Sequence, residues 1–118
     1  MPSPPSQRFP KTNRILKREV FKRVYEQGRK IQGRHFTAFT LENAEGRPRL
    51  GITATRKIGN SVERNRARRL VREAFRKNKW LAEVGVDIVI NVKPLLVDAS
   101  YRDVEVEFIA LLQRVSRK

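Results

Sequence analysis

The chain has 118 residues, of which 39% are hydrophobic, enough for one domain with a modest core. Its 27 Lys and Arg residues outnumber 12 Asp and Glu residues, and the formal charge of +15 indicates a polyanionic partner such as nucleic acid. The lack of cysteine excludes disulfides and cysteine-based zinc sites. No apolar run approaches the ~20 residues that span a bilayer, and the first residues lack the apolar segment of a secretory signal. We therefore expect a cytoplasmic protein with no membrane partner.

The N-terminal part of the chain divides into an arm and a helix. Three of the first five residues are proline, which predicts a flexible arm over residues 1–8. Residues 9–118 are expected to form a single domain, and the strong positive charge favours an RNA-binding domain. From Val20 onward, apolar residues recur at i, i+1, i+4 and i+5, the spacing of one helical face. This pattern predicts a helix over residues 17–27, ended by Gly28.

Two β-prone segments follow. In residues 34–42, Phe36, Ala38 and Thr40 alternate with Thr37, Phe39 and Leu41, as in a strand with two faces. Residues 49–54 form a short segment that is similarly rich in β-formers. The intervening Asn43-Ala44-Glu45-Gly46 has the composition of a turn. We expect these two strands to pair as a β-hairpin.

An arginine-rich helix is predicted next, from Ser61 to Lys77, with Asn60 or Ser61 as its N-cap. At 100° per residue, its apolar residues form one stripe, made of Ala67, Leu70, Val71, Ala74 and Phe75. The opposite face carries Arg64, Asn65, Arg68, Arg69, Arg72 and Arg76. Ten basic and only two acidic residues lie between Arg56 and Lys79. An ordinary solvated face has more acids for pairing, so the pattern favours rigid presentation of positive charge.

The C-terminal part of the chain contains a strand and a helix. Residues 86–92 form an apolar strand, ended by Pro94, which cannot donate a ladder hydrogen bond. Ser100 and Asp103 resemble a capping box at the start of an amphipathic last helix. The order of elements predicts an α+β sandwich, with helices packed on a small sheet.

From Lys57 to Glu73 the chain reads KIGNSVERNRARRLVRE. This run closely resembles the signature of the bacterial ribonuclease P protein component, and the resemblance extends over residues 9–115. It implies an α-β-β-β-α-β-α sandwich with a small central sheet, similar in topology to the second domain of ribosomal protein S5. It also implies a left-handed βαβ crossover through the arginine helix, whereas the general rule favours a right-handed one.

The resemblance further implies a division of labour. A large catalytic RNA holds the active centre and uses Mg²⁺ to remove the 5′ leader from precursor tRNA, while the protein supports that RNA and binds the leader, with no further protein partner required. The residues expected to bind RNA are Arg56, Lys57, Arg64, Asn65, Arg66, Arg68, Arg69, Arg72 and Arg76. The residues expected to line the leader cleft are Phe21, Tyr25, Thr37 and Phe39. Arg56 and Arg68 stand where the family often has Lys, and Thr37 stands where an apolar residue is common.

The residue types support this chemistry independently. Guanidinium groups engage phosphates through paired donors, stack on bases and stay charged at any ordinary pH. Phe21, Tyr25, Phe36 and Phe39 are able to stack on unpaired bases. Core packing is the competing interpretation for each ring, and without the resemblance it is favoured for Phe21 and Phe36.

A protein-borne active site has little support in the sequence. The single histidine, His35, is expected to be a surface or strand residue rather than a general base. No catalytic residue is therefore predicted in this chain, a metal site in the protein stays undetermined, and the chemistry is assigned to a partner.

Two other classes of function stay open at this point. A structural RNA-binding protein, such as a ribosomal protein, fits the composition equally well. A DNA-binding module could place the arginine helix in the major groove, but a helix-turn-helix reader needs a second helix immediately before it. A β-prone segment precedes the arginine helix here.

Overall fold

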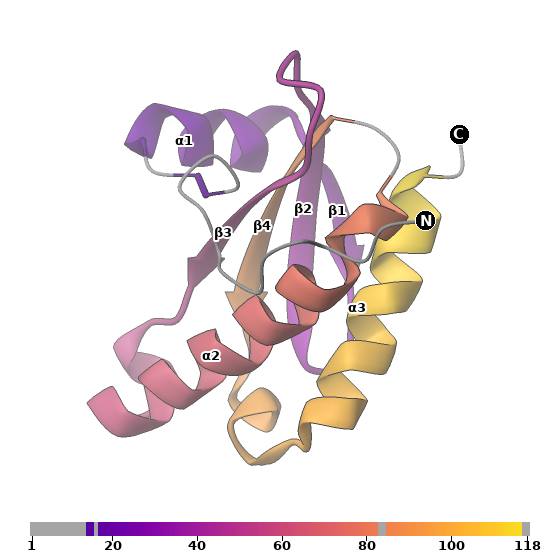
Figure 1. The fold of residues 1–118 in the computed structure, drawn as a ribbon. Coiled ribbons are helices and arrows are strands. Elements are labelled where there is room, and N and C mark those ends of the chain that lie inside the picture. The colour runs from indigo at the N-terminus through magenta and orange to yellow at the C-terminus, as the bar shows by residue number, and fades with distance from the viewer. Residues whose placement is uncertain (1–13, 16, 83–84, 117–118) are drawn as a thin grey trace.

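A computed structural model describes residues 14–15, 17–82 and 85–116. The arm predicted over residues 1–8 lies outside them. The described elements follow the predicted α-β-β-β-α-β-α order (Figure 1). They are α1 (Arg18–Gln27), β1 (Arg29–Gln32), β2 (Phe36–Glu42), β3 (Arg49–Thr53), α2 (Ser61–Asn78), β4 (Val86–Val92) and α3 (Tyr101–Ser116). Short 3₁₀ turns cover Arg56–Ile58, Lys79–Leu81 and Pro94–Asp98.

The four strands form one mixed sheet in the order β1-β2-β4-β3. The predicted hairpin between residues 34–42 and 49–54 is wrong, because β4 lies between β2 and β3. β4 pairs antiparallel with β2 and parallel with β3. Every residue of β4 except Asn91 is buried, so this strand needs a neighbour on each edge and a helical layer on each face. The actual hairpin joins β2 to β1, a short and mostly exposed edge strand that the sequence pattern did not locate.

The connection from β3 through α2 to β4 is left-handed, as the family resemblance implies. Figure 1 shows both strands running downward, α2 in front of the sheet, and β4 to the right of β3. The general preference for right-handed crossovers therefore fails here. The consequence is that α2 begins beside the end of β3 and crosses the sheet toward α3.

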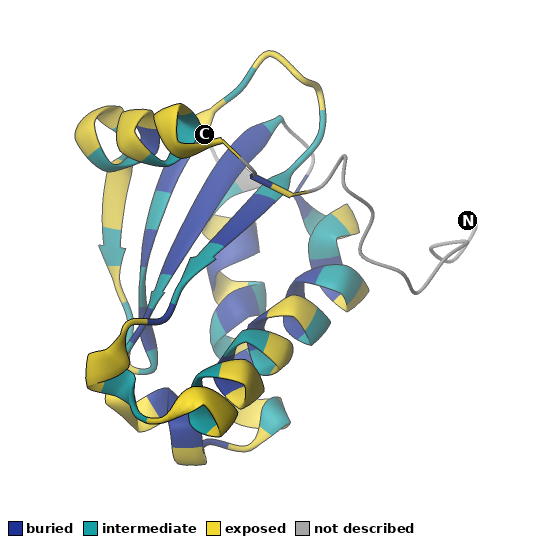
Figure 2. Ribbon diagram, turned by 90° about the vertical axis from the view of Figure 1, so that its left-hand side faces the viewer, coloured by how far each residue is buried: buried dark blue, intermediate teal, exposed yellow. Residues whose placement is uncertain are grey.

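The main core lies between the sheet and the two helices α2 and α3 (Figure 2). The predicted apolar stripe of α2 is confirmed, since four of its five residues are 0% exposed and Leu70 packs at the edge of the core. Phe36 of β2 is 2% exposed, and its ring centroid lies 6.0 Å from that of Phe108 on α3. Phe36 is thus a core residue, which confirms the interpretation favoured without the family resemblance.

Among the described helices, α1 is the one that covers the opposite face of the sheet, where Ile15, Val24 and Val89 form a smaller cluster. Gly51 of β3 gives room for this packing, because a Cβ atom there would lie 2.6 Å from Cζ of Phe21. Only Val24 of α1 is fully buried, so most of this helix remains exposed, as Figure 2 shows in yellow. The aromatic residues on this face are therefore only half-buried.

A buried ion pair holds one end of the sheet together. Asp87 of β4 is 1% exposed, and Arg49 of β3 donates to it through Nε at 2.7 Å and Nη2 at 2.9 Å. Asn43 of the β2–β3 loop adds a third hydrogen bond at 2.8 Å. The hydrogen bonds to Asp87 raise the pKa of Arg49. Arg49 thus neutralises the buried carboxylate within the sheet, and the hydrogen bond from Asn43 ties the loop to it.

Candidate nucleic-acid interface

The start of α2 is built by its own sequence. Gly59 adopts a φ of +154°, a value that side chains rarely allow, and so turns the chain into the helix. Asn60 is the N-cap, as predicted: its side chain accepts from the Glu63 amide at 2.9 Å. The Glu63 carboxylate in turn accepts from the Asn60 amide at 2.9 Å, which completes a capping box.

Both acidic residues of this segment are engaged, Glu63 in the cap and Glu73 further along the helix. Glu63 is occupied at the N-terminus, and Glu73, the other acid of the segment, pairs with Arg76 and lies 3.9 Å from Lys77. Within the described part of the chain, Arg64, Arg68, Arg69 and Arg72 have no ion pair with a carboxylate. The guanidinium charges in the middle of the helix are thus uncompensated.

Several positive charges lie close together around Arg72. Arg72 is exposed, but partial desolvation of its guanidinium lowers its pKa, and the nearby positive charges of Arg14 and Arg68 lower it further. The group still stays protonated at ordinary pH. Arg14 belongs to the segment that bridges to Leu50 of β3, so the positive surface continues from α2 across the outer edge of the sheet. A bound polyanion would relieve this repulsion.

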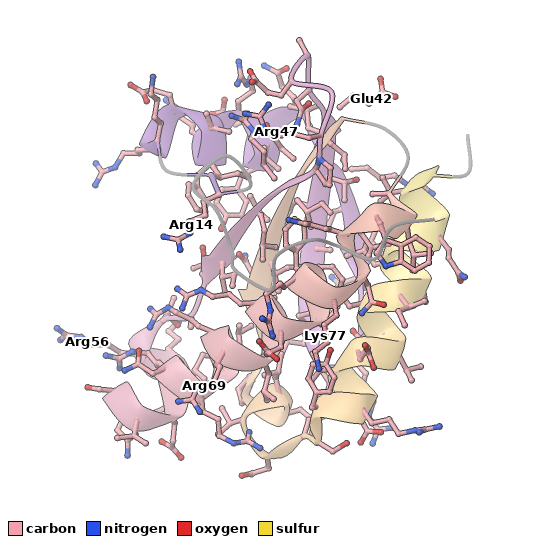
Figure 3. All side chains as sticks on the ribbon, in the orientation of Figure 1. Arg14, Glu42, Arg47, Arg56, Arg69 and Lys77 are labelled. Atoms are coloured by element: carbon pink, nitrogen blue, oxygen red, sulfur yellow. The ribbon has the colours of Figure 1, made fainter. Side chains whose placement is uncertain are left out.

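The remaining predicted RNA-binding residues surround this helix face. Arg56 and Lys57 lie exposed in the 3₁₀ turn before α2, and Asn65 and Arg69 are exposed on the helix. Figure 3 shows Arg56 and Arg69 extending away from the sheet, with Arg14 on the same side of the view. Arg64 and Arg68 are half-buried and donate to neutral oxygens, to Gly59 O at 2.9 Å and to Ala54 O at 3.4 Å. These bonds orient the guanidinium groups without neutralising them.

Two of the predicted arginines differ from the rest. Arg66 donates through Nη1 to the carbonyl oxygen of Val97 and through Nη2 to that of Ala99, at 3.2 Å. Arg76 is half-buried and forms its ion pair with Glu73. Both side chains therefore contact other parts of the protein, although Arg66 is exposed like Arg69 and Arg72.

The predicted leader-binding residues come together on the α1 face of the sheet. The rings of Tyr25 and Phe39 meet edge to face, with centroids 4.9 Å apart and an interplanar angle of 80°. Phe21 lies on α1 one turn before Tyr25, and Thr37 lies two residues before Phe39 on the same face of β2. All four side chains are half-buried, so each retains accessible surface. We call these four residues the aromatic surface.

Three further residues complete this surface and were not predicted. The Tyr25 hydroxyl donates to Asn91 Oδ1 at 2.7 Å and lies 2.9 Å from Thr53 Oγ1. The Nζ atom of Lys30 lies 6.0 Å from the Phe39 ring centroid, which adds positive charge. Asn91 could have been found, because it is one of two polar residues in a mostly apolar strand, with Asp87, and its position alternates onto the α1 face.

The histidine has a structural environment. His35 lies in the β1–β2 connection, with Nδ1 2.8 Å from Glu107 Oε1 of α3. Its backbone amide also donates to this carboxylate. Among the described residues, no group of three or more His, Asp or Glu side chains could hold a metal ion. None of the described helices is long and apolar enough to cross a bilayer.

Comparison with known proteins identifies the family. The model of the family described as Ribonuclease P matches residues 9–116. This chain belongs to the ribonuclease P protein family. The match includes the whole of α2 with its arginine face, and also α1 and the sheet that carry the aromatic surface.

Relatives and solved structures agree with this assignment. A ribonuclease P protein component from Syntrophus aciditrophicus is 43% identical over 104 residues, which cover 88% of this chain and 87% of the relative. One from Desulforapulum autotrophicum is 38% identical over 109 residues, covering 92% and 93%. The structure of the RNase P protein from Thermotoga maritima matches with a TM-score of 0.78 at 31% identity, covering 86% of this chain and 96% of that chain. These findings give no support to the ribosomal or DNA-binding alternatives.

Proposed function

We propose that this ribonuclease P protein binds a catalytic RNA through the arginine face of α2 and binds the 5′ leader of precursor tRNA on the aromatic surface. In this proposal the RNA holds the active centre and its Mg²⁺ ions, and the protein assists removal of the leader. The active centre is assigned to the RNA because the resemblance of the arginine motif implies it.

The uncompensated charge of Arg64, Arg68, Arg69 and Arg72 is the observation that carries the proposal. A helix fixed by a capping box and docked on the core holds these groups in a rigid array. Rigid guanidinium groups neutralise phosphates at low entropic cost, and they release counterions from the RNA. The protein thereby reduces the repulsion between an RNA enzyme and its RNA substrate.

The aromatic surface supports the second part of the proposal. A single-stranded leader exposes unpaired bases, which stack on accessible rings such as Tyr25 and Phe39. The Tyr25 hydroxyl is held by Asn91, so the ring keeps one orientation. Lys30 beside Phe39 supplies a positive charge for the leader phosphates.

Reconstitution tests the function directly. The ribonuclease P RNA of the same organism, transcribed in vitro, is combined with the protein and 5′-labelled precursor tRNA at limiting Mg²⁺. We expect the wild-type protein to stimulate cleavage at the mature 5′ end and Arg69→Ala/Arg72→Ala to stimulate it less. Arg102→Ala, which removes an exposed arginine from α3, is the matched control and should retain stimulation. RNA binding without stimulation would favour a purely structural RNA-binding role.

A further inference from the structure

Trp80 is an exposed aromatic residue just beyond the end of α2. It is 54% exposed, whereas the core rings Phe36, Phe75 and Phe108 are at most 2% exposed. Among the aromatic residues that the structure describes, it is the only one in the exposed class. A large indole in water leaves apolar area unburied, and tryptophan at such positions commonly serves as a contact residue.

The local structure holds the indole in place. The 3₁₀ turn Lys79–Leu81 continues directly from α2, and Leu81 packs against the main core. The turn therefore directs Trp80 outward. The indole Nε1 donates to the carbonyl oxygen of Lys77 at 3.0 Å, which restricts rotation of the ring. A restricted ring loses little conformational entropy when a partner packs on it.

The segment that precedes Trp80 in the chain is basic. Residues 72–79 contain Arg72, Arg76, Lys77 and Lys79 but only one acid, Glu73. Protein interfaces have few lysines around a central tryptophan, whereas surfaces that bind single-stranded nucleic acid combine positive charge with exposed rings. The charge therefore favours an RNA contact over a protein contact. Lys77 lies beyond Arg69 along α2 in Figure 3, so the basic surface continues along the helix toward Trp80.

We propose that Trp80 stacks on an unpaired base of the RNA partner and extends the RNA interface along α2. This inference rests on the proposed function, because it requires a bound RNA. Trp80 follows Arg69 by eleven residues, or roughly 16 Å at the rise of a helix. The contact is thus a separate subsite rather than part of the arginine face. Its energy comes from stacking and not from charge.

The chain contains a single tryptophan, so intrinsic emission reports on this position alone. The protein is titrated with the ribonuclease P RNA of the same organism, and binding is followed in parallel by filter retention. We expect tryptophan emission to be quenched as the complex forms. Trp80→Ala should weaken RNA binding roughly five-fold or more. Trp80→Phe should weaken RNA binding less, because it keeps an aromatic ring. The salt dependence of binding should stay unchanged in both variants, because no charge is removed.

Leu95→Ala is the matched control, since Leu95 is 50% exposed and lies in the 3₁₀ turn before α3. It should bind RNA like the wild type. Two results together would overturn the subsite and leave the proposed function intact. The wild-type protein would retain RNA on the filter with unchanged tryptophan emission, and Trp80→Ala would bind RNA with an affinity within two-fold of wild type. Failure of the wild type to bind the RNA would overturn both. A concentration-dependent dimer that shifts the emission without RNA would assign Trp80 to a second copy of the chain. If Trp80→Ala does not fold, the wild-type emission and Trp80→Phe still decide the question.

Discussion

The Arg66 guanidinium donates through Nη2 to the carbonyl oxygen of Ala99, 3.2 Å away, and so ties α2 to the segment before α3. A second bond runs from Nη1 to the carbonyl oxygen of Val97. One arginine of the arginine-rich motif therefore links two helices that share the main core. Arg69, three residues along the helix, is exposed like Arg66 but has no hydrogen bond to this segment.

Arg66 and Arg69 should respond differently to truncation. The sequence alone predicts that Arg66→Ala and Arg69→Ala both weaken RNA binding without affecting the fold. Because Arg66 is hydrogen-bonded to Val97 and Ala99, an unaffected fold is now expected only for Arg69→Ala. Arg66→Ala should lower the free energy of unfolding by about 1.5–3 kcal/mol, because hydrogen bonds from a charged group are lost. Arg69→Ala should change it by less than about 0.5 kcal/mol. Urea denaturation measures both, and equal stabilities would contradict a structural role for Arg66.

RNA binding should depend steeply on salt. The arginine face and the neighbouring basic residues are expected to neutralise about six to eight phosphates, so log affinity should fall against log salt with a slope of roughly −4 to −7. Arg69→Ala should make the slope shallower by about one. Filter binding over a range of KCl concentrations gives these values. A wild-type slope shallower than about −2 would show that charge is not the main source of affinity.

The aromatic surface should distinguish precursor from mature tRNA. Phe39→Ala should weaken binding of precursor tRNA to the reconstituted enzyme by about 1–3 kcal/mol and leave mature tRNA nearly unaffected, since only the precursor carries a leader. Tyr25→Phe is the control, because it keeps the ring and loses only the hydroxyl bonds to Asn91 and Thr53. Equal losses for both tRNAs would show that Phe39 acts through packing.

Stability should fall at alkaline pH through Tyr101. Burial raises its pKa, and the hydrogen bond to Glu105 at 3.0 Å and the charge of Glu73 raise it further, against a smaller opposing effect of Arg76. In the unfolded chain tyrosine ionises near pH 10. The unfolded state therefore releases this proton first, so the contribution is complete below about pH 9 and declines as the pH rises above about 10.

Tyr101→Phe removes the ionisable group and tests this assignment. The urea midpoint of the variant should decline less between about pH 8.5 and pH 11 than that of the wild type. Comparing the two declines, rather than the midpoints themselves, cancels the loss of the hydrogen bond to Glu105. If the urea midpoints of the two proteins decline equally, Tyr101 contributes nothing to the loss of stability at alkaline pH.

Helical periodicity was the most reliable guide from sequence to structure. The apolar stripe and basic face of α2 follow directly from spacing, and Asn60, one of the two predicted N-cap candidates, caps the helix. The pairing of β2 was not predictable from local pattern, because it depends on β4, which lies more than forty residues further along the chain. β1 was missed because a four-residue exposed edge strand carries almost no hydrophobic alternation.

In the candidate site, too, contacts between segments that are distant in the sequence were not predictable. Residue types and spacing brought together the arginine face, and the family resemblance supplied Phe21, Tyr25, Thr37 and Phe39. The contacts of Arg66 with Val97 and Ala99 depend on how α3 docks beside α2, so no motif could reveal them. The compensation of Arg76 by Glu73 was visible in the sequence as an i,i+3 pair.

In the function proposed above, the protein lowers the electrostatic cost of bringing an RNA substrate to a catalytic RNA. The most direct measurement is multiple-turnover cleavage of precursor tRNA as a function of Mg²⁺, with RNA alone and with RNA plus protein. We predict that the protein lowers the Mg²⁺ concentration for half-maximal cleavage and has no nuclease activity alone, because fixed cations replace part of the mobile ones. An unchanged Mg²⁺ requirement, or precursor cleavage by the rigorously purified protein alone, would contradict the account.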